Sequence, residues 1–515
     1  MKKKLFVQNA AVMSGTSLLL KAIGMFFRIW LSNRIGGEGM GLYQLIFSIY
    51  ILGSTIATTG LLTAVTRLVT EASATKNERD IPRILRRALL LAVGLSVLST
   101  VLFYLAAPLI GSLWIGDTRS IPALRILVFG FPFMGISATL KGYFIARRRA
   151  ELPSMAQIFE QLTRIGITVW LFSQAEPTVS SYCFAIMLSD VISEALSAGF
   201  SACCYAFERD KVQPPRGNRP PLRVTRRLIG IAAPITAGRY LNTILRTIEN
   251  IQVPRCLAVF SGSNELGLTA FGNLKGMAMP LIFFPSSLLS AFSTLLIPEM
   301  SEALALGQHL RVRHIADTTI RITMAGAWLC AGCFWLLGYP LGELFYGSKE
   351  VGFYIRVLAP LVPLMYLESV VDGILKGLNQ QAKSLKYSLI DSGLRIVLIA
   401  LVVPRFGMRG FLYIMVLSNL LTCLLNTGRL CRVTHLPVDL THWLLRPLGC
   451  TVIGCALAQT ILFMPLFRTS VSIAQVVIGA LLCAGCTLVL FLLSQTIGFE
   501  LLSGIVIKKA SRRTP

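Results

Sequence analysis

Six basic residues lie inside apolar stretches that are long enough to cross a membrane. They are Lys21, Arg28, Arg67, Arg239, Arg246 and Lys275. A charge at the centre of a lone membrane helix costs about 2.5–3.5 kcal/mol, so it is retained where it is paired, reaches an interface or lines a wet cavity. Lys21 and Arg28 are two helical turns apart, and Arg239 and Arg246 repeat that spacing. Each pair therefore projects from one face of its helix.

These side chains predict a cationic cavity. Arginine binds phosphate oxygens through two parallel N–H donors, so an anionic substrate that carries phosphate is favoured. Glu249 lies one turn after Arg246 and can pair with it, which leaves a surplus of positive charge. The alternative is that the basic residues reach the membrane interfaces and pair with Asp190 and Glu194 of another apolar stretch.

The elements that must position these residues are membrane helices. Of the 515 residues, 54% are hydrophobic and 14% are charged, and the mean hydropathy is +0.68. Soluble domains have about 25% charged residues. Fourteen apolar stretches of span length can be distinguished, among them 7–31, 42–70, 384–404 and 408–428. The composition therefore predicts an all-α polytopic membrane protein with about 14 transmembrane helices.

The distribution along the chain of the residues behind the net charge of +25 tests the predicted set of membrane helices. When the N-terminus is placed inside, alternate connections carry 30 Lys and Arg residues on the inner side and 6 on the outer side. This asymmetry follows the positive-inside rule and predicts a multi-pass protein of the cytoplasmic membrane with both termini in the cytoplasm. Topology accounts for most of the basic residues, so nucleic acid is not expected as a partner.

The chain contains an internal repeat. Leu140-Lys141-Gly142 recurs as Leu375-Lys376-Gly377, and Thr70-Glu71-Ala72 matches Ser301-Glu302-Ala303. Six spans fit in each copy, and an even number returns the chain to its starting side, so the copies insert in parallel. The predicted regions are an N-lobe at 1–206, a basic cytoplasmic linker at 207–227, a C-lobe at 228–432, and the last two spans with a basic tail at 433–515.

Several motifs resemble one known family. Lys21-Ala-Ile-Gly24, Arg28-Ile29 and Ile35-Gly-Gly-Glu-Gly-Met-Gly-Leu-Tyr43 resemble the opening of the stage V sporulation protein B family, in the polysaccharide branch of the multidrug/oligosaccharidyl-lipid/polysaccharide exporter superfamily. Thr66-Arg67-Leu68-Val69 is similar to the end of that family's second span, and Ala278-Met279-Pro280-Leu281 to its eighth. The resemblance extends from about residue 8 to about residue 500.

The resemblance implies an alternating-access flippase related to the lipid II flippases. Its substrate would be an undecaprenyl-diphosphate-linked oligosaccharide or a lipid II-type peptidoglycan precursor, moved from the inner to the outer leaflet. Arg28, Arg67 and Lys275 match basic positions that line the cavity in relatives, whereas Arg239 and Arg246 depart from the family pattern. Relatives are driven by membrane potential or sodium, and Glu249 and Asp391 are the acidic candidates for ion coupling.

Two other functions are less favoured by the residues. A cation-coupled multidrug exporter of the same superfamily would suit an acidic cleft, which the basic bias opposes. A membrane enzyme would need a catalytic carboxylate or histidine on an accessible loop, and no such cluster stands out, so no enzyme is predicted. The CxxC spacings at Cys330–Cys333 and Cys483–Cys486 lie within apolar stretches without a nearby histidine, and we interpret them as packing residues. No metal or cofactor is expected. Anionic membrane lipids and cell-envelope synthesis proteins are the expected partners.

Overall fold

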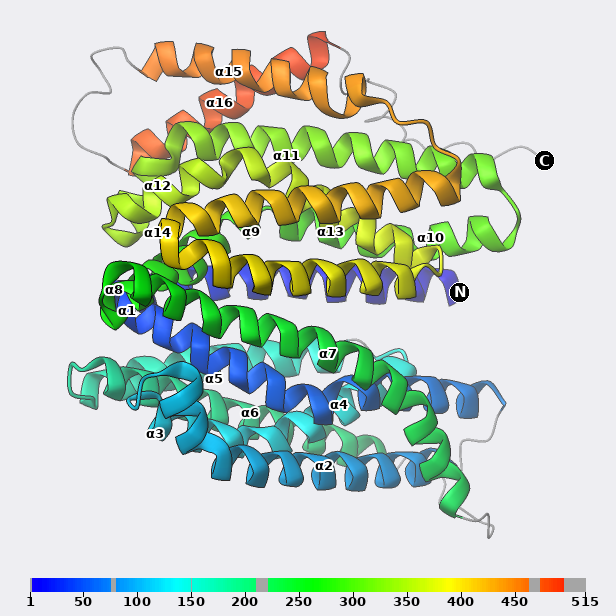
Figure 1. Ribbon diagram of the computed structural model, residues 1–515. Helices are drawn as coiled ribbons and strands as arrows, with labels where there is room; N and C mark the ends of the chain where they lie inside the picture. The colour runs from blue at the N-terminus through cyan, green and yellow to red at the C-terminus, as the bar shows by residue number, and fades with distance from the viewer. Residues whose placement is uncertain (1, 76–79, 150, 210–220, 463–472, 495–515) are drawn as a thin grey trace. The chain divides into compact units, whose positions relative to one another are not determined.

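The computed structural model describes residues 2–75, 80–149, 151–209, 221–462 and 473–494 (Figure 1). Throughout these ranges the regular secondary structure is helical, which confirms the predicted all-α class. Residues 210–220 of the predicted linker and 495–515 of the predicted tail lie outside the described residues. The chain forms two compact units: unit 1 runs to Gly272 and includes Ile399–Pro404, and unit 2 holds the remainder.

Unit 1 is built from long helices with short connections. The first helix, α1, contains two consecutive predicted spans. The elements of this unit are α1 (Lys2–Ala74), α2 (Ile81–Leu109), η2 (Ile110–Ile115), α3 (Ser120–Leu127), η3 (Val128–Gly130), α4 (Phe131–Ala146), α5 (Glu151–Gln174), α6 (Val179–Arg209), α7 (Pro221–Ser261) and α8 (Asn264–Phe271).

Unit 2 has the same character, with two further helices at its end. Its elements are η4 (Gly272–Ala278), α9 (Met279–Phe283), α10 (Ser286–Ala305), α11 (His309–Tyr346), α12 (Lys349–Leu358), η5 (Ala359–Leu361), α13 (Val362–Gly377), α14 (Gln381–Thr434), η6 (Thr441–Leu445), α15 (Arg446–Leu462) and α16 (Ile473–Leu493). The segment η4 is a π-helix, so Lys275 lies within a local widening of the helix.

Glycine turns join the predicted spans within α1 and α14. Gly36 has φ 68° between the stretches 7–31 and 42–70, and Gly407 has φ 57° between 384–404 and 408–428. Glycine reaches positive φ without the steric penalty of a Cβ atom. Serine side chains begin other helices: the Ser263 Oγ accepts from the Leu266 N–H, and the Ser348 Oγ accepts from the Val351 N–H. These hydrogen bonds satisfy backbone donors at the helix starts.

Ten helices of the described chain are long and apolar enough to cross a membrane. The protein is therefore a multi-pass membrane protein. One of the ten, Gly15–Ala74, contains two of the predicted spans, and α5 and α14, which carry charged pairs, are not among the ten. Fourteen spans remain a prediction.

The internal repeat is visible in both units as an equivalent hydrogen bond between helices, which we call the tie. The Thr66 hydroxyl of α1 donates to the Gly142 carbonyl of α4 at 3.1 Å, and the Ser301 hydroxyl of α10 donates to the Gly377 carbonyl of α13 at 2.9 Å. Both ties join residues 76 positions apart. The structural counterpart of Ser301 is therefore Thr66 rather than Thr70, so the sequence match was shifted by one helical turn.

Candidate functional site

Five of the six predicted cationic residues lie in unit 1, and Lys275 lies in unit 2. On α1, Lys21 is exposed and Arg28 is half-buried. Arg28 is close enough to Tyr43 on the same helix to interact electrostatically with its hydroxyl. The two basic residues therefore differ in their surroundings, although their spacing places them on one face.

Arg67 forms an ion pair with an acidic residue that is not one of the predicted site residues. The Arg67 Nε lies 3.1 Å from the Glu71 Oε1, and the Nη2 of Arg227 on α7 lies 2.7 Å from the Glu71 Oε2. The Arg67–Glu71 spacing of one turn was a readable signal for this ion pair. Nothing in the sequence could have found the Arg227 contact, because it joins residues 156 positions apart.

Arg239 and Arg246 are both exposed on α7, as their shared face requires. Glu249, proposed for ion coupling, is buried at 3% exposure. The residues beside it contact α1: the Thr247 hydroxyl donates to the Ser48 carbonyl at 3.4 Å, and the Asn250 amide donates to the Ser48 hydroxyl at 3.0 Å. Glu249 therefore lies in a packed helix interface, whereas Arg246 lies on an open face.

Lys275 in unit 2 is half-buried, and its Nζ lies 6.0 Å from the ring centre of Phe411. An ammonium at this distance is attracted to the face of an aromatic ring. Its neighbour Asn273 donates to the Glu350 carboxylate at 2.9 Å. These contacts position the π-helical segment that carries Lys275 within unit 2.

The second residue proposed for ion coupling, Asp391, is buried in α14. Its Oδ1 accepts a hydrogen bond from Ser418 at 2.6 Å, and its Oδ2 lies 4.0 Å from the Arg395 Nη1. Asp391 therefore contacts polar groups on both sides of the Gly407 turn of α14, Arg395 before it and Ser418 after it. Asp391 and Arg395 are one helical turn apart, a spacing at which opposite charges can pair.

The sequence Asp391-x3-Arg395-Ile396 has a counterpart in unit 1, Glu160-x3-Arg164-Ile165. The ion pair of unit 1 includes an additional acid. Arg164 of α5 lies 2.8 Å from Glu160 and 2.6 Å from Asp190 of α6. The Thr168 and Ser189 hydroxyls, 2.6 Å apart, join the same two helices. The structure thus pairs Asp190 with Arg164, whereas the alternative sequence interpretation assigned Asp190 to the six cationic residues. Glu194 follows Asp190 by one turn and is also buried.

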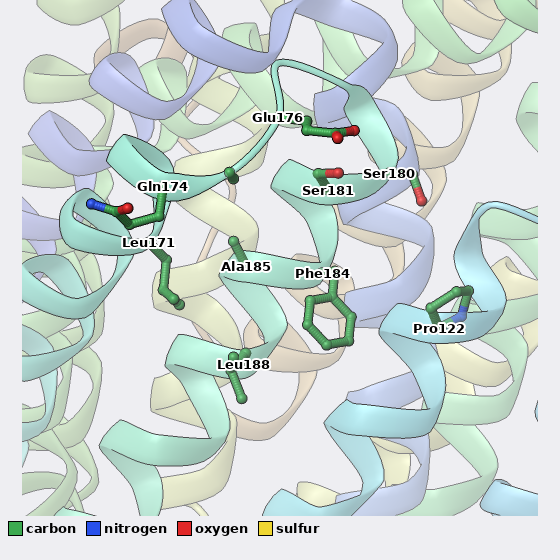
Figure 2. A pocket seen from close by; sticks show the side chains of 10 residues that line it. Pro122, Leu171, Gln174, Glu176, Ser180, Ser181, Phe184, Ala185 and Leu188 are labelled. Carbon is green, nitrogen blue, oxygen red and sulfur yellow. The ribbon is translucent and has the colours of Figure 1, made fainter.

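A cavity of about 380 Å³ lies at another place in unit 1, between α5, α6 and the start of α3 (Figure 2). Leu171, Phe184 and Leu188 form its apolar part, and Glu176 with Ser181 lies at its polar end. None of the eight predicted site residues lines it. This cavity therefore differs from the predicted cationic cavity in position and in charge.

The helical architecture defines a class, that of multi-pass membrane proteins. Solved structures share this fold. A structure titled "Lipid II flippase MurJ, inward closed conformation" aligns with a TM-score of 0.70 at 12% identity, over 93% of this chain and 99% of that chain. An inward-facing multidrug resistance MATE family transporter of the MOP superfamily aligns with a TM-score of 0.63 at 15% identity, over 83% of this chain and 100% of that one.

Sequence comparison then identifies the family. The model of the polysaccharide biosynthesis protein family matches residues 6–304, and the chain belongs to this family. It is similar to stage V sporulation protein B of Bacillus subtilis, with 25% identity over 90% of this chain and 91% of that protein. It is also similar to the lipid II flippase MurJ of Bacillus subtilis, with 21% identity over 77% of each chain. The chain is thus a transporter or flippase of the MOP superfamily.

Proposed function

We propose that this protein is an alternating-access flippase for an undecaprenyl-diphosphate-linked oligosaccharide or a lipid II-type peptidoglycan precursor. The observation that carries this proposal is the surplus of basic residues on α1 and α7 of unit 1, at Lys21, Arg28, Arg67, Arg239 and Arg246. Guanidinium groups suit a diphosphate because they donate in parallel to its oxygens. Lys275 of unit 2 completes the proposed substrate-binding set.

The proposed orientation places both termini in the cytoplasm, since the basic connections then lie inside. In this arrangement the lobes are 1–206 and 228–432, the linker 207–227 contacts anionic lipids, and 433–515 adds the last two helices. The substrate enters from the inner leaflet and leaves to the outer leaflet. Cell-envelope synthesis proteins would supply and consume it. The protein acts as a transporter rather than as an enzyme.

The proposed driving force is ion movement coupled through Glu249 or Asp391. Both carboxylates are buried, at 3% and 6% exposure. Replacing either with its amide should change the dependence of transport on a sodium gradient or on membrane potential. A variant that keeps the wild-type dependence would exclude its residue from coupling.

The decisive experiment is translocation of a fluorescent lipid-linked oligosaccharide in proteoliposomes. We expect Arg28→Ala and Arg67→Ala each to slow translocation about tenfold or more, because each removes a charge-assisted hydrogen bond to phosphate. Wild-type translocation in both variants would exclude the proposed cavity. The second candidate, a multidrug exporter, is supported by the structural similarity to MATE transporters. Export of cationic dyes that depends on Glu249 would favour it.

A further inference from the structure

Two guanidinium groups from different helices converge on one carboxylate in unit 1. Glu71 receives Arg67 of its own helix at 3.1 Å on one oxygen and Arg227 of α7 at 2.7 Å on the other. The side chains of Arg67 and Arg227 are 65% and 64% exposed, and that of Glu71 is 40% exposed. We call Arg67, Arg227 and Glu71 the guanidinium clamp. Its exposure leaves it accessible to a ligand.

The helices that carry the guanidinium clamp are closely packed about two turns away from it. A Cβ atom on Gly60 would lie 2.3 Å from the Ala232 carbonyl oxygen, so α1 and α7 approach each other closely at this point. Leu68 and Leu228, each one residue away from a clamp arginine, are buried in the same hydrophobic cluster. The two guanidinium groups are therefore carried at a fixed spacing, which reduces the ordering cost of binding.

The charges around the guanidinium clamp favour an anion. The hydrophobic cluster under it joins the end of α1 to the starts of α2 and α7 and to α4. Among the side chains that the structure describes at the end of α1 and the starts of α2 and α7, the acids are Glu71 and Asp80, and the bases are Arg67, Arg83, Arg86, Arg87, Arg226 and Arg227. Exposed ion pairs are worth about 0–1 kcal/mol, so Glu71 is held weakly. A more highly charged anion can displace it, because phosphate accepts stronger hydrogen bonds.

We propose that Arg67 and Arg227 form a binding site for the diphosphate group of the substrate, and that Glu71 is the counter-ion that occupies this site when no substrate is bound. This inference rests on the proposed function, since it assigns the substrate class. The Glu71 carboxylate presents two oxygens to two guanidinium groups, which is the arrangement that two phosphate oxygens would take. On binding, Glu71 is displaced and no covalent bond changes. Glu71 acts as a positioning residue for the two arginines.

The test measures the affinity of farnesyl diphosphate for the full chain in phosphatidylcholine nanodiscs. We expect Glu71→Gln to tighten binding roughly twofold to tenfold, because the competing carboxylate is gone. We expect Arg227→Gln to weaken binding about tenfold or more, because a charge-assisted hydrogen bond is lost. A purely structural ion pair would not give opposite signs for its two partners. Unchanged or weaker binding by Glu71→Gln would overturn the proposal.

Matched variants separate the guanidinium clamp from general electrostatics. Arg226→Gln removes the same charge from the next position of α7, and Glu302→Gln removes an exposed carboxylate from α10 of unit 2. We expect both to change the affinity less than about twofold. Arg227→Lys keeps the charge but loses the planar fork, so it should restore only part of the affinity. Equal losses in Arg226→Gln and Arg227→Gln would refute a specific site.

The same assay distinguishes the possible sources of phosphate. Inorganic diphosphate should compete with farnesyl diphosphate if the diphosphate group is the ligand. If phosphatidylglycerol nanodiscs abolish binding to the wild type, the site is a phospholipid site and the assignment is wrong. Translocation measured in parallel separates the two proposals. If the variants change the affinity for farnesyl diphosphate as expected but the wild type does not translocate the lipid, the flippase is refuted and the guanidinium clamp is supported. If the wild type translocates the lipid but the variants leave the affinity unchanged, the guanidinium clamp is refuted and the flippase is supported.

Discussion

The two units share a scaffold but differ in charge. Thr66 reaches the Gly142 carbonyl in unit 1, and Ser301 reaches the Gly377 carbonyl in unit 2, with nearly the same distances. The residue that follows this tie is Arg67 in unit 1 and Glu302 in unit 2. The hydrogen bond between helices is thus kept in both copies, while the sign of the adjacent charge is reversed. The hydrogen bond between helices therefore does not depend on the sign of the adjacent charge.

The half-buried arginines Arg164 and Arg395 also differ between the two units. Arg164 contacts two carboxylates, Glu160 and Asp190, at 2.8 and 2.6 Å. Its counterpart Arg395 lies 4.0 Å from Asp391, which also accepts a hydrogen bond from Ser418. Asn419 stands where unit 1 has Asp190. Unit 1 therefore carries a stronger buried ionic network than unit 2.

Replacing Arg164 or Arg395 should show the largest difference in stability between the two units. We expect Arg164→Leu to lower the free energy of unfolding by about 3–5 kcal/mol, because the buried Asp190 and the half-buried Glu160 both lose their partner. Arg395→Leu should cost less, about 1–3 kcal/mol, since Ser418 still donates to Asp391. Thermal unfolding of both variants in detergent measures the difference. Equal losses would show that the second carboxylate in unit 1 adds no stability.

The shared tie should give equal effects in both units. Ser301→Ala removes the hydrogen bond to the Gly377 carbonyl, and Thr66→Val removes a hydroxyl that is shared between the Leu62 carbonyl at 2.8 Å and the Gly142 carbonyl at 3.1 Å. We expect each change to cost about 1 kcal/mol. Thermal unfolding measured for both single variants and for the double variant tests whether the ties act independently. A loss confined to one variant would contradict their structural equivalence.

Replacing the lysines of the repeated Leu-Lys-Gly motif should show a smaller difference in stability between the two units. Lys376 lies 2.6 Å from Asp372, and unit 1 has Ser137 in place of that acid. We expect Lys376→Met to cost about 0.2–1 kcal/mol, since the pair is partly exposed. Lys141 forms no ion pair of this kind with the residues that the structure describes, although Glu160 and Glu194 are near enough to interact with it electrostatically. High salt should erase the effect at Lys376, which a salt series of melting temperatures can show.

The connection that leads from α14 to the last two helices should give the smallest effect. Partial burial opposes ionisation of Asp439, but hydrogen bonds from the backbone N–H and ring of His442, with the Arg321 charge, hold the pKa of Asp439 below its usual range. A carboxyl with a lowered pKa stabilises the folded state above its unfolded pKa, and this stability is lost as pH falls through the folded pKa. Asp439→Asn should therefore reduce the acid sensitivity of the melting temperature below about pH 4. An unchanged pH profile would exclude this role.

The sequence predicted the class of fold and the repeat because both follow from patterns along the chain. Long apolar stretches dictate membrane helices, and the Leu-Lys-Gly motif identifies equivalent positions in each copy. The match of Thr70 with Ser301 was wrong by one turn, since neighbouring turns of an apolar helix present similar residues. The ion pairs one turn apart, at Glu160–Arg164 and Asp391–Arg395, were also readable. Arg227 and Asp190 were not assigned to their partners, because contacts between helices leave no spacing rule in a single sequence.

The glycine turns at Gly36 and Gly407 have a consequence for synthesis of the protein in the cell. Each turn joins two apolar segments through a single residue with positive φ. Because the connection is this short, one apolar segment cannot remain in water while the other is already inserted in the lipid. Each pair should therefore enter the membrane as a hairpin, so that Lys21 and Arg28 arrive together with the helix that carries Arg67. The free energy of inserting these charges is then offset by the apolar surface of two helices rather than of one.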